Sequence, residues 1–251
     1  MRQNVMIRLG LLVVLVGSLA GSAAPPGFAL PMGPRQIADF EREALAVLRW
    51  LMGQPHQDRG DRVIFTVRHA TFKGFRVKEG EVELEGLTPR LQASLAAGQA
   101  GFDEVRTLAA LQARATLTAA DLQAFIDQEI AKTHGERKIF EAVALRFLPN
   151  AVEVSGRVRL DRLPGNVLSF LAQEPSPFRA TVTLAIEGDR LVIDILEAQV
   201  NGQPMTSELR TQVLGWLNPL WDFSQLPYPA RLESLTITPT GLSASGWLFA
   251  P

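Results

Sequence analysis

A series of short segments that alternate apolar and polar residues, separated by turn residues, most constrains the fold of this chain. The segment 62–72 (RVIFTVRHATF) alternates in this way. Two further pairs of alternating runs meet at Pro149-Asn150 and at Glu187–Arg190. Because strands that follow one another through tight turns must pair antiparallel, we expect eight or more antiparallel strands and no βαβ organisation.

Helical periodicity interrupts the strands in three places. Apolar residues recur every three or four positions in 35–53, in the segment that opens at Thr118, and in 206–217. Thr118 followed three residues later by Asp121 is typical of a helix N-terminus. The chain is therefore predicted to be an α+β protein in which helices cover one face of a long antiparallel sheet.

Four stretches carry more specific predictions. A bulge or a turn is expected at Gly74-Phe75, and a turn at Lys78–Gly80. The alanine-containing segments 91–96 and 104–116 are interpreted as strands, with a helix as the open alternative in both. Residues 163–174 form a short apolar helix or a loop.

The N-terminus has the order of a secretory signal. Arg2 and Arg8 flank the first residues, an apolar run covers 9–20, and small residues follow. We predict that residues 1–29 are a signal peptide and linker, cleaved after Ala23 or Ala29, and that residues 30–251 form a single α+β domain. The alternative is an uncleaved anchor, although the run is shorter than the roughly 20 residues that a membrane-spanning helix needs. The expected location is periplasmic or extracellular.

Composition and motifs exclude several classes of function. The 251 residues include no cysteine, which excludes disulfides and thiolate chemistry, and the formal net charge of -1 does not fit a nucleic-acid-binding protein. The motifs of serine hydrolases, nucleotide-binding loops and zinc proteases are absent. His56, His69 and His134 lie far apart. We therefore expect no enzyme activity, no catalytic residue, no metal and no cofactor.

A concentration of basic residues has two interpretations. It comprises Arg59, Arg62, Arg68, Lys73, Arg76 and Lys78. It could make peripheral contact with anionic lipid headgroups. The favoured alternative is a set of strand-edge charges that discourage pairing between sheets, because acidic residues follow from Glu79 onward.

The stretch from Thr206 to Phe249 combines an amphipathic helix, an aromatic segment and a final pair of strands. Pro219 should end the helix. Trp216, Trp221 and Phe223 around this proline are either core residues, which the spacing favours, or the lining of an apolar cavity.

Three segments of the chain resemble a known family. They are LTAADLQAFI (117–126), VALRFLPNAVEVSGRVRL (143–160) and LNPLWDFSQLPYPARLESLTITPTGLSASG (217–246). They are similar to the LmeA-like family of exported phospholipid-binding proteins, which has a tubular lipid-binding-like fold. The resemblance extends from about Arg35 to Leu248.

The resemblance implies a long curved antiparallel sheet wrapped around amphipathic helices, with acyl chains sheltered between helix and sheet. The expected function is that of an exported non-enzymatic lipid-binding protein of the bacterial envelope, whose partner is a phospholipid or another acyl lipid. The alternative is a structural or protein-interaction module of the envelope with a fully packed core. The residues predicted to line a lipid tunnel are Leu209, Val213, Trp216, Leu217, Leu220, Trp221 and Phe223.

Overall fold

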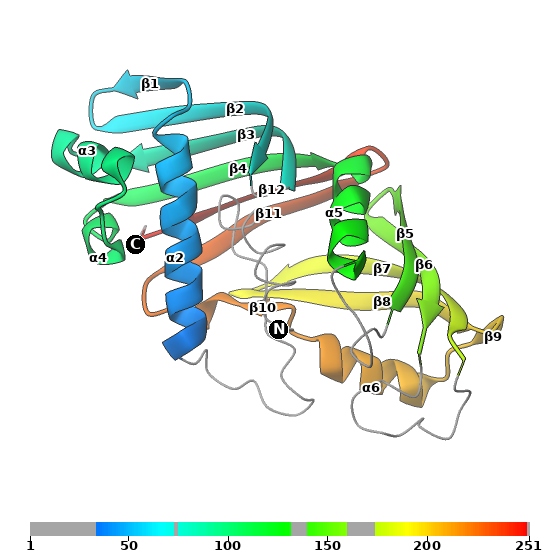
Figure 1. Ribbon diagram of the computed structural model, residues 1–251. Coiled ribbons are helices and arrows are strands. Elements are labelled where there is room, and N and C mark those ends of the chain that lie inside the picture. Colours follow the sequence, from blue (N-terminus) through cyan, green and yellow to red (C-terminus); the bar gives the residue numbers. More distant parts are fainter. Residues whose placement is uncertain (1–33, 73–74, 132–139, 160–173, 250–251) are drawn as a thin grey trace.

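A computed structural model of the chain describes residues 34–72, 75–131, 140–159 and 174–249, and two antiparallel sheets organise them (Figure 1). Sheet A has the order β1 (His56–Arg59), β2 (Arg62–Phe72), β3 (Phe75–Glu85), β4 (Ala110–Thr118), β12 (Gly241–Leu248) and β11 (Ala230–Thr238). Sheet B has the order β10 (Trp221–Asp222), β8 (Arg190–Val200), β7 (Ser176–Glu187), β6 (Ala151–Val158) and β5 (Phe140–Leu148), with β9 (Gln203–Pro204) also paired to β8. The predicted α+β, antiparallel class is confirmed, but the strands form two sheets where the sequence predicted one.

Helices cover both sheets. They are α2 (Pro34–Leu51), α3 (Pro89–Ala97), α4 (Phe102–Val105), α5 (Ala119–Ala131), α6 (Ser207–Leu217) and the short 3-10 helix η3 (Phe223–Gln225). In Figure 1, α2 crosses sheet A beside α3 and α4, and α6 lies below sheet B. Helix α5 contacts β5 of sheet B and also β3, β4 and β12 of sheet A, so it spans the junction between the sheets.

Two of the predicted helices begin where the sequence indicated. Helix α2 buries its apolar stripe against sheet A, with Phe40, Leu48 and Leu51 each no more than 5% exposed. At the start of α5, the backbone N–H of Asp121 donates to Oγ1 of Thr118 at 3.1 Å, and this hydroxyl donates to the Asp121 carboxylate at 2.6 Å. The aspartate thus reaches the cap hydroxyl, whereas the longer side chain of a full capping box would reach the cap backbone.

Two predictions of local structure are wrong. Lys78–Gly80 is not a turn but the middle of β3, where Glu79 pairs with both Arg68 and Thr116. Pairing with a strand on each side of β3 stabilises the extended conformation more than the glycine favours a turn. Residues 91–96 are helical, as the alternative allowed: Thr88 caps the N-terminus of α3, and Gly98 ends the helix with a φ of 72°.

The other predicted elements have mixed outcomes. Residues 104–116 divide between α4 and β4. The hairpins β5–β6, β7–β8 and β11–β12 are present as predicted. The predicted signal segment, Gly74 of the feature predicted at Gly74-Phe75, and residues 163–173 of the predicted helix or loop lie outside the described residues.

The two sheets share one apolar core. The buried apolar side chains of the described residues form a single cluster with members from both sheets. At the junction, β11 contacts β5, β6 and β7, and the backbone N–H of Asn150 in the β5–β6 turn donates to the Ile237 carbonyl at 3.1 Å. Sheet A and sheet B are therefore packed against each other through β11.

Candidate functional site

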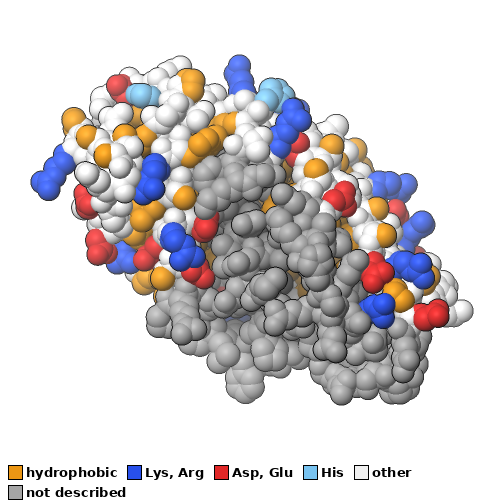
Figure 2. All heavy atoms as spheres, in the orientation of Figure 1, with side chains coloured by type: hydrophobic (Ala, Val, Ile, Leu, Met, Phe, Trp, Pro, Cys, Tyr) orange, Lys and Arg blue, Asp and Glu red, His pale blue; other side chains and the backbone are white. Residues whose placement is uncertain are grey.

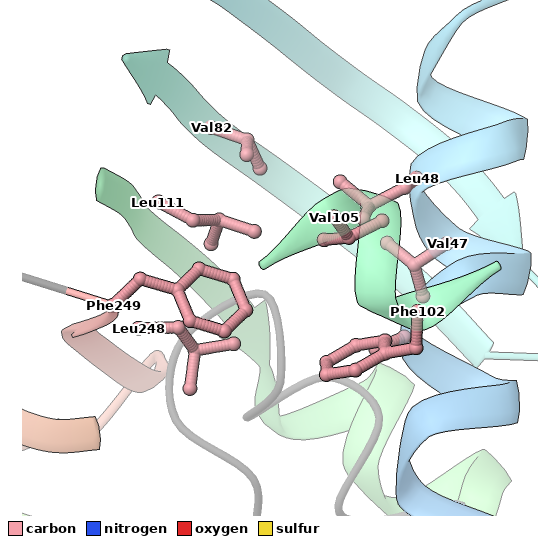
Figure 3. A pocket seen from close by; sticks show the side chains of 9 residues that line it. Val47, Leu48, Val82, Phe102, Val105, Leu111, Leu248 and Phe249 are labelled. Atoms are coloured by element: carbon pink, nitrogen blue, oxygen red, sulfur yellow. The ribbon is translucent and has the colours of Figure 1, made fainter. Parts of the chain in front are cut away.

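The interior between sheet A and its helices is filled with side chains. Every apolar residue of β3 and β4 that faces α2 is at most 5% exposed, including Val82, Leu84 and Leu111. A void of only about 10 Å³ lies between α2, α4 and the ends of β4 and β12, and side chains converge on it from all of them (Figure 3). This is about the space that one water molecule needs. Among the described residues, this void is too small for an acyl chain.

The inner face of sheet B is apolar but much less completely covered. Strand register places its residues in continuous rows: Leu145 opposite Val154, Val154 opposite Ala180, and Leu184 opposite Ile193. All five of these side chains are half-buried. The equivalent face of sheet A is more completely buried, although Leu235 and Leu242 on it are half-buried. Sheet B also has a buried row, formed by Phe147, Val152, Val182 and Ile195. The half-buried apolar side chains of sheet B lie on both sides of that row.

Each edge of sheet B is held to a helix by one carboxamide side chain. At the β5 edge, Gln123 of α5 donates to the Val143 carbonyl at 2.8 Å and accepts from the Leu145 N–H at 2.7 Å. At the β8 edge, Asn218 accepts from the Ile193 N–H at 2.8 Å and donates to its carbonyl at 2.7 Å. Both amides pair with the strand as another strand would. The apolar face is thus framed by α5 on one side and by the end of α6 on the other.

Helix α6 is attached to β8 at both ends. Before the helix, β9 pairs with Gln199 and Val200. After the helix, Asn218 caps the C-terminus, the peptide bond to Pro219 is cis, and the backbone N–H of Leu220 donates to the Leu191 carbonyl at 2.9 Å. The predicted end of the helix at Pro219 is confirmed.

The predicted lining residues occupy two different environments. Trp221 is 5% exposed and Phe223 2% exposed, and both belong to the core, with their rings 5.9 Å apart in an edge-on arrangement. Leu209, Val213, Leu217 and Leu220 are half-buried, and of these Val213 and Leu220 pack against the core. The Trp216 side chain lies outside the described part. Whether these residues line a lipid tunnel stays a prediction.

The sequence reasoning missed part of the candidate surface. Leu214 is not among the predicted lining residues, yet it packs against the core, as Val213 does. The half-buried rows of sheet B were recognised as alternating strands but were not proposed as a binding face. Their alternation was a usable signal, although it does not distinguish a fully covered face from a partly covered one.

A comparison with protein families shows to which family this chain belongs. The model of the LmeA-like phospholipid-binding family matches residues 57–246, from β1 into β12. The chain belongs to the LmeA-like family. Searches of curated proteins and of solved structures gave no match. For an LmeA-like protein the partly covered apolar face of sheet B is the candidate site, because phospholipid binding requires accessible apolar surface.

An ion pair between a buried aspartate and an exposed arginine lies at the α6 end of this face. The Asp222 carboxylate is 6% exposed, accepts from Arg190 at 3.0 Å, and accepts from the Ser224 N–H at 3.1 Å and from its hydroxyl. Burial by itself would raise the pKa of Asp222. The hydrogen bonds from Ser224 and the positive charge of Arg190 outweigh burial and hold the pKa of Asp222 below its usual value.

Among the described residues of this LmeA-like protein, the buried polar atoms without a hydrogen-bond partner include Nε1 of Trp221 and the hydroxyl of Tyr228. Tyr228 packs among Phe40, Phe102 and Phe249 in the sheet A half. Burial, together with the negative charge of Glu41, raises the pKa of Tyr228 far above its usual value, while Arg106 acts in the opposite direction. Tyr228 therefore stays neutral and does not act as a base near neutral pH.

Many charged groups of the described residues form ion pairs with one another. No group of three His, Asp or Glu side chains among them could hold a metal ion. In the basic segment of β2 and β3, Arg62 pairs with Glu83 at 2.9 Å, Arg68 with Glu79 at 3.9 Å, and Arg76 with Asp121 at 3.9 Å. Figure 2 shows basic and acidic side chains intermixed on the described part of that view. No helix within the described ranges is long and apolar enough to cross a membrane.

Proposed function

We propose that this LmeA-like protein is an exported, non-enzymatic lipid-binding protein of the bacterial envelope that shelters acyl chains on the inner face of sheet B, between α5 and α6. The observation that carries the proposal is the contrast between the two sheets. Most of the inner apolar side chains of sheet A are buried against its helices, whereas six apolar side chains of sheet B are only half-buried: Leu145, Val154, Ala180, Leu184, Ile186 and Ile193. Membership of a phospholipid-binding family supports this use of the surface.

The energetics of acyl binding fit such a face. Each methylene that moves from water into an apolar site contributes about 0.8 kcal/mol. A few methylenes in contact with Leu184 and Ile193 would therefore give appreciable affinity without any charged partner. The free protein would keep a partly exposed apolar surface, which a bound chain would cover.

The direct test is to extract the purified protein with organic solvent and to measure phospholipid by mass spectrometry. A fluorescent fatty-acyl probe added to delipidated protein provides the second measurement. We expect lipid in stoichiometric amount and saturable uptake of the probe. Absence of both would remove the proposal.

A second candidate function rests on the filled interior of sheet A. Around Val82, Leu111 and Phe102 the protein has only a water-sized void, as expected of an envelope module that acts through protein contacts. If this packing describes the whole protein, delipidated and untreated samples will have the same melting temperature and neither will take up the probe. Lipid binding will instead raise the melting temperature by mass action.

The proposed location is periplasmic or extracellular, and it rests on the N-terminal residues. Arg2 and Arg8 around an apolar run give the pattern of an export signal. Fractionation of cells that express the tagged protein, together with N-terminal sequencing, tests the location and determines whether cleavage follows Ala23 or Ala29.

A further inference from the structure

The end of sheet B where β5 begins and β6 ends carries an aromatic pair, of which Phe140 is exposed and Phe178 is half-buried. Phe140 is 40% exposed, and its ring lies 5.7 Å from that of Phe178 in an edge-on arrangement. Phe140 pairs with Val158, which in turn pairs with Ser176, so both rings are on the inner, apolar face at its last rows. The pair therefore forms the rim of the candidate acyl-binding face.

Arginine side chains without acidic partners lie beside this pair. Arg179 follows Phe178 directly, and Arg157 precedes Val158; both are exposed. Arg157 donates to the Pro175 carbonyl at 3.2 and 3.3 Å, and neither arginine forms an ion pair with a described residue. The nearby Glu141 is engaged by Arg159 at 3.5 Å. This strand end therefore presents guanidinium groups to solvent.

We propose that this end of sheet B, defined by Phe140, Phe178, Arg157 and Arg179, docks edge-on to the surface of a bilayer that contains anionic phospholipid. Alternation along the strands places the two rings on one face and the two arginines on the other. At a strand end both faces reach the same plane, so the rings can enter the headgroup region while the arginines contact phosphates. The other exposed large apolar side chain among the described residues, Leu196, stands away from this rim on the outer side of β8.

This contact deepens the proposed function, because it would place this end of the acyl-binding face against the membrane from which a chain enters. The biological role of this docking assumes the proposed function. The docking itself depends on the exposed Phe140 ring and on two arginines that form no ion pair with a described residue, and it can be measured without any lipid being taken up.

The experiment is flotation of the purified protein with two kinds of vesicle: phosphatidylcholine alone, and equal parts of phosphatidylcholine and phosphatidylglycerol. We expect binding to the anionic vesicles that weakens at high salt. Because each arginine near an anionic surface contributes about a fivefold change in partitioning, Arg157→Gln with Arg179→Gln should weaken binding about 30-fold. Phe140→Ala should weaken it about fivefold, whereas Leu196→Ala, the matched control, should bind as the wild type does.

The outcomes separate docking from lipid uptake. Wild-type protein that ignores anionic vesicles, or arginine variants that bind them as well as the wild type, would overturn the inference. Equal losses for Leu196→Ala and Phe140→Ala would overturn it as well. If the fluorescent acyl probe is never taken up but vesicle binding still depends on Phe140 and the arginines, the proposed function fails and the docking surface stands. Circular dichroism checks folding, and the exposed Arg179→Gln alone keeps the test valid if the Phe140 variant unfolds.

Discussion

The side-chain amide of Asn218 pairs with both backbone groups of Ile193, accepting from its N–H at 2.8 Å and donating to its carbonyl at 2.7 Å. Twenty-five residues separate the two positions. The amide acts as a one-residue strand at the edge of sheet B, directly where α6 ends. This contact holds α6 at the border of the half-buried apolar face.

Asn218→Ala should destabilise the protein by about 2 kcal/mol, because it leaves two backbone groups of Ile193 without their partners. Urea unfolding measures the loss, and hydrogen exchange should be faster at the Ile193 amide in particular. Gln203→Ala, an exposed amide on β9, is the control and should stay within about 0.5 kcal/mol of the wild type. An unchanged exchange rate at the Ile193 N–H would show that water replaces the Asn218 side chain without loss of stability.

Leu184→Asn should reduce the affinity for an acyl probe about tenfold, since it places a polar group on the inner face of sheet B. Thr183→Asn is the matched control, because residue 183 is also half-buried but lies on the opposite face. Probe titration by fluorescence compares the two variants. Equal affinities would argue that acyl chains do not contact this face.

Asp222→Asn should cost about 2 kcal/mol near neutral pH, through weaker bonds from Arg190 and Ser224. The pKa of Asp222 is lowered in the folded protein, so its contribution is complete above the unfolded value of about 3.9 and disappears as pH falls through the folded pKa. Urea unfolding at a series of pH values should therefore show wild type and variant converging in acid. Asp103→Asn, whose side chain is 96% exposed, should change little at any pH. A difference that grows in acid would contradict the assignment.

Gly241→Ala should destabilise the protein by at least about 3 kcal/mol. A Cβ atom there would lie 1.9 Å from the Leu117 carbonyl oxygen, and the φ of 150° is rarely adopted by other residues. Gly215→Ala in α6 is the control: it meets nothing within 4 Å and should stabilise the helix by up to about 1 kcal/mol. Thermal unfolding measures both changes, and a Gly241 variant as stable as wild type would mean that β12 can move away from β4.

Local patterns predicted most elements because each depends on residues close in the sequence. Alternation defined the hairpins around Pro149-Asn150 and Gly188-Asp189, and Thr118 marked the start of α5. The turn predicted at Lys78–Gly80 was wrong because the conformation of these residues depends on distant residues, namely the strands that pair with both sides of β3. The sequence does contain the start and end signals of helix α3, namely Thr88-Pro89 and Gly98. The apolar residues between them were nevertheless interpreted as a strand.

The candidate site was less accessible to sequence reasoning. The C-terminal stretch was recognised as important, and Trp221 and Phe223 are core residues in the structure, as their spacing favoured. How completely the strand face of Leu184 and Ile193 is covered depends on where α5 and α6 lie. Those positions are set by contacts between residues far apart in the chain.

The sequence by itself determined the α+β class, the antiparallel hairpins and the family, because periodicity, caps and turns act over a few residues. Only the tertiary structure decided that β12 pairs with β4, that the strands divide into two sheets, and that Gln123 and Asn218 hold the edges of sheet B. Pairing between distant strands gains its free energy from side chains that meet only after folding. No local pattern contains that information. The largely buried interior of sheet A and the partly covered face of sheet B can therefore be recognised only in the tertiary structure.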